Sequence, residues 1–174
     1  MSKIVVECVQ GNITSQEGID VVVNAANAEL RSGGGVAGAI HKAAGPELYR
    51  ECKPLAPIKT GGAVITKAYE LPNKYVVHCL GPVYGVDKPE GKLLADCYIN
   101  ALKIADEKGA SSIAFPAIST GIFGYPVQEA AKVAFAAIKS QLNDLKNIKL
   151  IRIVLWDRSD FNYHEEALIQ ANIT

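Results

Sequence analysis

The chain contains Asn24-Ala25-Ala26-Asn27-Ala28-Glu29-Leu30-Arg31-Ser32-Gly33-Gly34-Gly35-Val36-Ala37-Gly38-Ala39-Ile40-His41, a segment with two asparagines and three consecutive glycines. The apolar run 21–23 before it is typical of a buried strand, and a helical pattern covers residues 36–44. Glycines allow positive φ and let a ligand approach the backbone closely. Free N–H groups at a helix start favour an anion. We therefore interpret the segment as a ligand loop, with phosphate as the natural ligand.

A second glycine-bearing turn, residues 117–125, strengthens this interpretation. Like the first loop, it follows an apolar strand pattern and precedes a helical one, which is where α/β sheets collect ligands. Two such loops at one sheet edge can clamp a diphosphate from both sides. The alternative for the first loop is a long, flexible surface turn, but three glycines in a row cost conformational entropy unless the backbone needs them.

Length and composition fit one globular domain spanning residues 1–174. Hydrophobic residues make up 49% of the chain and charged residues 21%, as is ordinary for globular proteins. Eighteen basic residues balance 18 acidic ones, and this neutral charge argues against nucleic acid or a membrane surface as partner. The first apolar patch is too short for a signal peptide, and no apolar run is long enough to span a bilayer. We expect a cytoplasmic protein.

The cysteines and histidines predict neither disulfides nor a metal site. The cysteines are widely spaced and form no Cys-x-x-Cys pair, so we expect buried free thiols at Cys8, Cys52, Cys79 and Cys97. The histidines lack two further ligands at metal spacing. His41, in the first helical pattern, could neighbour the ligand, but we expect it to pack or to face solvent. The sequence predicts no metal and no organic cofactor.

Hydrophobic periodicity predicts an α/β fold with six strands and five helices. The third and fourth strands follow each other without a helix, which indicates a sandwich around a mixed sheet. The expected strands are residues 4–10, 20–24, 63–69, 75–80, 112–116 and 150–156. The expected helices are residues 36–44, 46–52, 92–108, 126–142 and 162–171.

Two nucleotide-binding motifs can be set aside. Gly33-x-Gly35-x-x-Gly38 matches the dinucleotide fingerprint formally, but that fingerprint places its first glycine almost directly after the strand. Here eight residues separate Asn24 from Gly33, and the nearest suitable acid, Glu51, lies in a helical pattern. No Gly-x-x-x-x-Gly-Lys-Ser/Thr occurs, which excludes a P-loop NTPase.

Taken together, four segments resemble the macrodomain family over essentially the whole chain. They are residues 11–14 (Gly-Asn-Ile-Thr), 23–27 (Val-Asn-Ala-Ala-Asn), 33–40 (Gly-Gly-Gly-Val-Ala-Gly-Ala-Ile) and 114–124 (Ala-Phe-Pro-Ala-Ile-Ser-Thr-Gly-Ile-Phe-Gly). The resemblance implies a three-layer α/β/α sandwich around a six-stranded mixed sheet, with ADP-ribose bound in a cleft at the strand ends. Many members remove ADP-ribose from proteins or deacetylate O-acetyl-ADP-ribose, and others only bind.

The resemblance also implies a role for each matching position. Asn12 and Ile13 would meet the adenine, and Trp156 would stack on it. Asn27 would hold the distal ribose beside the scissile bond and, with Gly34, forms the expected catalytic pair. The two loops would enclose the diphosphate and distal ribose through Gly33, Gly34, Gly35 and Val36 on one side and Ser119, Thr120, Gly121, Ile122 and Phe123 on the other.

The residue types suit these roles, with alternatives at two positions. An Asn amide can donate to and accept from ribose hydroxyls, and a Trp face suits a purine. Trp156 could instead be a core residue, because an apolar strand pattern leads into it. Asn24 is better interpreted as structural, with its side chain satisfying backbone groups of the loop.

Two departures from the family pattern bear on function. Most members carry Asp where this chain has Asn12, so adenine loses a charge-assisted bond. The better-known hydrolase branch has Asp where Ala37 stands, so the substrate's own phosphate would have to activate water. The leading hypothesis is a hydrolase acting on ADP-ribosylated Glu/Asp protein or O-acetyl-ADP-ribose; the alternative is a non-catalytic ADP-ribose reader. Nucleotide or RNA binding in the same cleft is disfavoured by the neutral charge.

Overall fold

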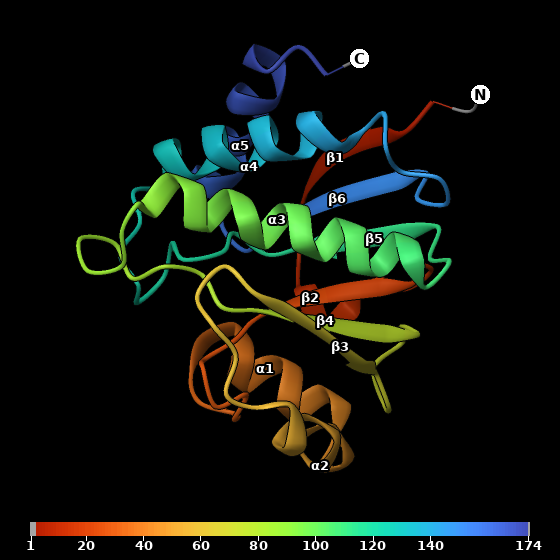
Figure 1. Cartoon of the computed structure of the whole chain (residues 1–174). Helices are drawn as coiled ribbons and strands as arrows, with labels where there is room; N and C mark the ends of the chain where they lie inside the picture. Colours follow the sequence, from red (N-terminus) through yellow and green to blue (C-terminus); the bar gives the residue numbers. More distant parts are fainter. Residues whose placement is uncertain (1–2, 174) are drawn as a thin grey trace.

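The computed structural model describes residues 3–173, in which one six-stranded sheet is covered by helices on both faces (Figure 1). The strands are β1 (Val5–Gln10), β2 (Val21–Ala25), β3 (Ala63–Lys67), β4 (Tyr75–Cys79), β5 (Ser112–Phe115) and β6 (Leu150–Leu155). The α-helices are α1 (Gly35–Ala44), α2 (Glu47–Cys52), α3 (Glu90–Glu107), α4 (Val127–Gln141) and α5 (Arg158–Gln170). Short 3-10 turns follow β1 (Ile13–Ser15) and α2 (Lys53–Leu55).

The sheet is mixed, as the sequence predicts. Its strand order is β1-β6-β5-β2-β4-β3, and every neighbouring pair is parallel except β3 with β4. The antiparallel pair is the one that the sequence joins without a helix. Parallel strands need a crossover connection, whereas antiparallel neighbours can be joined by a short loop.

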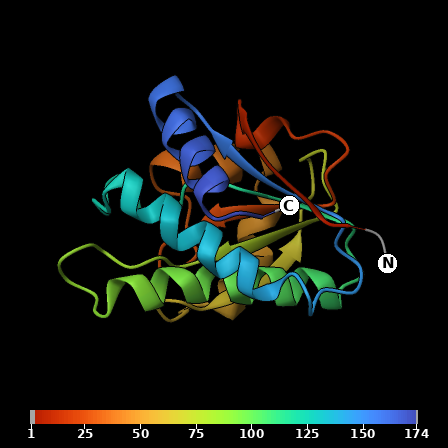
Figure 2. The ribbon, with the colours of Figure 1, turned by 90° about the horizontal axis from the view of Figure 1, so that it is seen from above.

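Two hydrophobic cores, one on each face of the sheet, make the fold three-layered. Alternate residues of the strands point to opposite faces, so Val21 and Val23 pack with α3 and α4 while Val22 packs with α1 and α2. Figures 1 and 2 show α3, α4 and α5 on one side of the sheet and α1 and α2 on the other. The α/β/α sandwich is thus confirmed.

Two helices begin earlier than the sequence analysis expects. Helix α5 begins at Arg158 rather than residue 162, because the Asp157 carboxylate caps it by accepting from the backbone N–H of Asp160 over 2.8 Å. Helix α3 begins at Glu90, directly after Pro89, where we expected a loop. In consequence Trp156 lies between the end of β6 and the α5 cap.

The cysteines are free, as expected, although Cys8 is only partly buried. No helix within residues 3–173 is long and apolar enough to cross a membrane.

Candidate functional site

The predicted ligand loops all lie at one edge of the sheet. Strands β1, β6, β5, β2 and β4 are parallel, so their carboxyl ends lie along the same edge. The loops that leave those ends carry the predicted positions in the strand order: Asn12 after β1, Trp156 after β6, Ser119 after β5 and Asn27 after β2. Residues far apart in sequence therefore form one row.

A crevice is expected between β5 and β2, the strands at the centre of the sheet. The chain leaves β2 toward α1 on one face and leaves β5 toward α4 on the other. Within residues 3–173 only two residue pairs, Val21 with Ile113 and Val22 with Ala114, join β2 to β5, so β2 pairs with β5 over its first two residues alone. Ligands of open α/β sheets bind where neighbouring connections part in this way.

Asn27 organises the glycine loop through both ends of its side-chain amide. Its Oδ1 accepts from the backbone N–H of Arg31 over 2.9 Å. Its Nδ2 donates to the carbonyl oxygens of Arg31 and Ser32, over 2.9 and 3.5 Å. The amide is therefore partly engaged within the protein, a structural function that the sequence analysis did not predict for this residue.

The glycines of this loop serve different purposes. Gly33 and Gly35 have φ values of +107° and +57°, which side-chain-bearing residues rarely adopt. Gly38, one turn into α1, lies so close to the Gly33 carbonyl that a Cβ would overlap it. Gly34 has an ordinary φ of −96°, and a Cβ there would meet nothing within 4 Å. Because Gly34 caps α1 without a side-chain bond, backbone N–H groups remain at the helix start.

The second loop is held in a strained conformation around Ser119. This residue has φ +69° although it is not glycine, and its buried Oγ has no hydrogen-bond partner within residues 3–173. Its carbonyl accepts from the N–H of Tyr125 over 2.9 Å. Ile122 is fully exposed at the tip of the loop, while Phe123 is half-buried.

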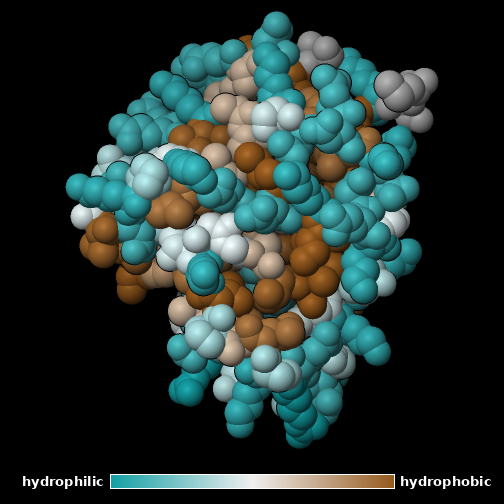
Figure 3. Space-filling model, in the orientation of Figure 1, coloured by the Kyte–Doolittle hydropathy of each residue, from teal (hydrophilic) through white to brown (hydrophobic). Residues whose placement is uncertain are grey.

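The segment between β4 and α3 packs against the second loop and supports it. The sequence analysis did not predict this contact. Gly81 lies so close to Ser119 that a Cβ would overlap the Ser119 Oγ and approach Ile118 Cγ2 within 2.6 Å. Tyr84 and Tyr125 have ring centroids 4.8 Å apart. This segment projects from the molecule beside α3 in Figure 1, and brown, apolar atoms lie among polar ones at that edge of Figure 3. Its Val86 side chain is exposed. The signal available in the sequence was its density of Gly and Pro.

At the β1–β6 end, the side chain of Asn12 is partly used by its own turn. Its Oδ1 accepts from the backbone N–H and from Oγ1 of Thr14, over 2.9 and 2.8 Å. Ile13 is buried in the α1–α2 core. Trp156 is 76% exposed, which excludes the alternative of a core tryptophan.

Asn24 is structural, but its partner is not the one expected. Its Nδ2 donates to His78 Nδ1 over 3.0 Å, not to the loop backbone as the sequence analysis expected. His78 Nε2 then donates over 3.0 Å to Thr66 Oγ1, whose own proton goes to the Lys67 carbonyl. Burial lowers the pKa of His78 to about 3, so the imidazole is neutral. Its Nδ1 therefore accepts the bond from Asn24, and its Nε2 carries the proton that goes to Thr66.

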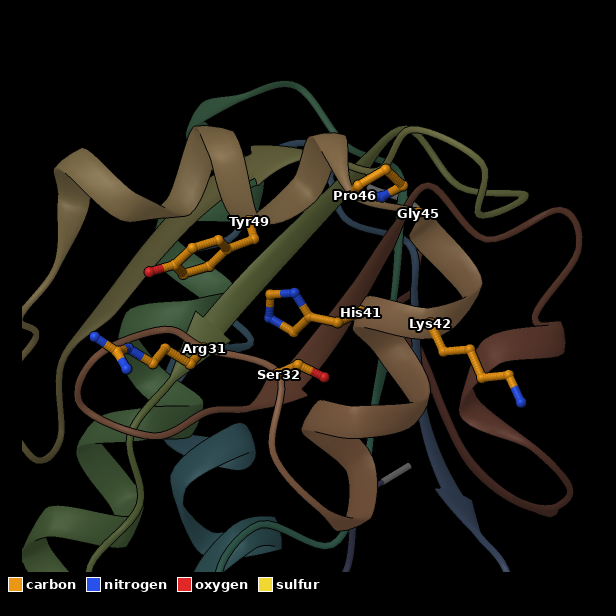
Figure 4. A pocket seen from close by; sticks show the side chains of 7 residues that line it. All are labelled: Arg31, Ser32, His41, Lys42, Gly45, Pro46 and Tyr49. Atoms are coloured by element: carbon orange, nitrogen blue, oxygen red, sulfur yellow. The ribbon is translucent and has the colours of Figure 1, made fainter.

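A pocket of about 660 Å³ lies on the other side of the glycine loop, between that loop, α1 and α2 (Figure 4). His41 lines it and is itself buried. Residues 3–173 contain no group of three or more His, Cys, Asp or Glu side chains arranged to hold a metal ion.

Comparison with known proteins places this geometry in one family. The Macro domain family profile matches residues 23–134. An O-acetyl-ADP-ribose deacetylase of Cronobacter sakazakii is 44% identical, and the match covers 95% of this chain and 94% of that protein.

Solved macrodomain structures superpose closely on this chain. The Oceanobacillus iheyensis macrodomain with ADP superposes with a TM-score of 0.88 at 41% identity, covering 94% of this chain and 89% of that one. A Trypanosoma brucei macrodomain in complex with ADP-ribose gives 0.87 at 34% identity, covering 94% and 68%.

Proposed function

Because this chain belongs to the Macro domain family, we propose that it binds ADP-ribose along the carboxyl edge of its sheet and removes an acyl group from the distal ribose. The substrates are O-acetyl-ADP-ribose or protein modified by mono-ADP-ribose on Glu or Asp. Water attacks the acyl carbonyl carbon, the bond to the ribose oxygen breaks, and a carboxylic acid and ADP-ribose are released.

The observation that carries the binding proposal is a pair of glycines that the protein itself does not need. Neither Gly34 nor Gly121 has positive φ, and a Cβ on either would meet no atom within 4 Å. Gly34 lies in the first ligand loop and Gly121 in the second. A ligand that lies against both backbones explains why neither position carries a side chain.

Strand order supports the direction in which the ligand lies. The row runs from Asn12 and Trp156, through the loop of Ser119–Phe123, to Asn27 and the glycine loop. ADP-ribose has the same order of parts: adenine, diphosphate, distal ribose. The diphosphate would then lie beside the N–H groups at the start of α1, which favour negative charge. We assign Ile13, Gly33, Gly35, Val36, Thr120 and Ile122 to ligand contact on the same basis.

The catalytic proposal depends on positioning, because the site offers no acid or base of its own at residue 37. Ala37 is buried in the first turn of α1. A phosphate oxygen of the bound substrate would accept the proton of the attacking water, while Asn27 orients the ribose and Gly34 leaves room for the bent diphosphate. Relatives named O-acetyl-ADP-ribose deacetylase support a hydrolase.

A second candidate function, a reader that binds ADP-ribose without turnover, is favoured by Ala37. One assay separates the two: incubate the protein with O-acetyl-ADP-ribose and with mono-ADP-ribosyl Glu/Asp protein, and follow product release. We expect release from at least one. Tight binding of ADP-ribose with no release from either substrate would identify the reader. Ala37→Asp tests the missing carboxylate, since a rate increase would mean that substrate-assisted water activation is limiting.

A further inference from the structure

The pocket between the glycine loop, α1 and α2 has no part in holding ADP-ribose as proposed above. Its volume of about 660 Å³ is in the range of ligand sites. Figure 4 shows Arg31 and Lys42 on opposite sides of the His41 imidazole, with the Lys42 side chain extending away from the ring. All three residues line the pocket. Tyr49 of α2 closes the pocket above His41, and the two rings have centroids 6.4 Å apart.

His41 is the one polar side chain in this pocket that is more than nine-tenths buried. It is 7% exposed, and its Nε2 has no hydrogen-bond partner within the described part of the chain. Figure 4 shows the ring extending from α1 toward Tyr49, across the pocket. Burial lowers the pKa of His41, so its imidazole is neutral at pH 7 and has a hydrogen bond to offer without adding charge.

The charge around the pocket favours an acidic occupant. The side chains of Arg31 and Lys42 form no ion pair or hydrogen bond within residues 3–173, and no Asp or Glu lines the pocket. The carboxylate of Glu70 packs against Gly45 at the α2 end. Figure 4 places Arg31 at the end of the pocket opposite Gly45, beside the glycine loop.

The pocket also adjoins the proposed position of the distal ribose. Arg31 and Ser32 line the pocket, and their backbone groups bond the side chain of Asn27. A Cβ on Gly33, the next residue, would lie 3.4 Å from Asn27 Nδ2. In the proposed binding mode, a group attached to the distal ribose would lie close to the Arg31 end of the pocket.

We propose that this pocket receives an acidic segment of the ADP-ribosylated protein, next to its modified residue. The proposal rests on the proposed function and names its substrate class: protein modified within an acidic sequence, held by Arg31, Lys42 and a hydrogen bond to His41. A free O-acetyl group has no such segment and would leave the pocket unused.

Two peptides test this with the full chain. Each carries ADP-ribose on its central residue through a hydrolysis-resistant linkage, with Asp on both flanks in one and Asn in the other. Fluorescence anisotropy gives Kd for each peptide and, by competition, for ADP-ribose. We expect the Asp peptide to bind wild-type protein about three- to fivefold more tightly, the range that exposed ion pairs allow. Lys42→Glu should abolish or reverse this preference and change the Kd for ADP-ribose less than about twofold.

The matched control is Lys132→Glu, the same charge reversal at an exposed position of α4, across the sheet. It should keep the wild-type preference. The ¹⁵N signals of the His41 ring should shift with the Asp peptide but not with ADP-ribose, while those of buried His164 in α5 stay fixed. Equal affinity for both peptides, or a preference that survives Lys42→Glu, overturns the proposal with ADP-ribose binding intact. Protein that does not bind ADP-ribose at all overturns the proposed function and this inference together.

Discussion

The backbone N–H of Tyr84 donates to the carbonyl oxygen of Phe123 over 2.8 Å. This bond joins the segment after β4 to the loop after β5, which we assign to the phosphates. A few residues earlier in the same segment, Gly81 packs against Ser119. The shape of the second ligand loop is therefore set in part by a neighbouring segment to which we assign no ligand contact.

Replacing Gly81 with alanine should disturb the ligand loop from outside it. The new Cβ would overlap Ser119 Oγ and Ile118 Cγ2, so these two buried side chains must shift within the loop, and we expect about tenfold weaker ADP-ribose binding, or about 1.4 kcal/mol. Isothermal titration calorimetry measures the change. Gly91→Ala, in α3, is the control, because its Cβ would meet only Tyr125 Oη at 3.8 Å. If Gly81→Ala binds ADP-ribose as tightly as wild type, the proposal that this segment supports the ligand loop is wrong.

Gly34→Val should impair turnover without destabilising the fold. The backbone at residue 34 suits any residue, and the space around it is open. We therefore expect Tm within a few degrees of wild type and kcat/KM lower by about tenfold or more, since a side chain would fill the place proposed for the ligand. A large drop in Tm would show that glycine is required there by the protein instead.

Asn27→Ala should lower both turnover and affinity. Removing the amide takes away the proposed ribose contact and also three hydrogen bonds that shape the loop. We expect kcat to fall by more than affinity, because orientation of the reacting ribose matters most in the transition state. Single-turnover kinetics beside calorimetry separate the two effects. Equal losses in both would assign Asn27 to loop structure alone.

Trp156→Ala should weaken adenine binding by about 1–3 kcal/mol, the usual range for base stacking. Because Trp156 is 76% exposed, its removal leaves no cavity. Ile169→Ala, at an equally exposed apolar residue of α5, should not change the affinity. As the chain has one tryptophan, ADP-ribose should also quench its fluorescence. Unchanged affinity together with unchanged fluorescence would remove Trp156 from the site.

Stability should decrease in acid through the buried histidines. In the unfolded chain His78 binds a proton below about pH 6.5, whereas in the fold its pKa is about 3. Between these values the unfolded state holds more protons, so the free energy of unfolding falls by about 1.4 kcal/mol per pH unit as pH decreases. Burial lowers the pKa values of His41 and His164 as well, which adds to the same trend. Urea titrations from pH 7 to 4 measure it. His78→Gln should give a shallower slope than wild type, and an unchanged slope would contradict this assignment.

Much of the fold could be predicted because hydrophobic periodicity is local. All six strands and five helices were predicted, with the helix boundaries of α3 and α5 as the main errors. The start of α5 had a signal in the sequence, since Asp157 stands three residues before Asp160, whose N–H it accepts. At the start of α5, the capping residue Asp157 was a better guide than the hydrophobic periodicity.

The contacts that were missed depend on strand register and order. Asn24 meets His78 because β2 and β4 are neighbours in a register that pairs these residues. Gly81 meets Ser119 because the loops after β4 and β5 turn toward each other, although β2 lies between those strands. The pocket beside His41 could not be predicted, because it is formed by the packing of α2 and the glycine loop against α1.

The narrow junction between β2 and β5 also makes ligand recognition a property of the whole chain. Val21 and Val22 pair with Ile113 and Ala114, which come from the second half of the sequence. A chain that stopped before residue 112 would keep the glycine loop but lack the second ligand loop. A ligand held by both loops would stabilise only the completely paired sheet. Protection by ADP-ribose against unfolding would then report that the two halves of the polypeptide have joined.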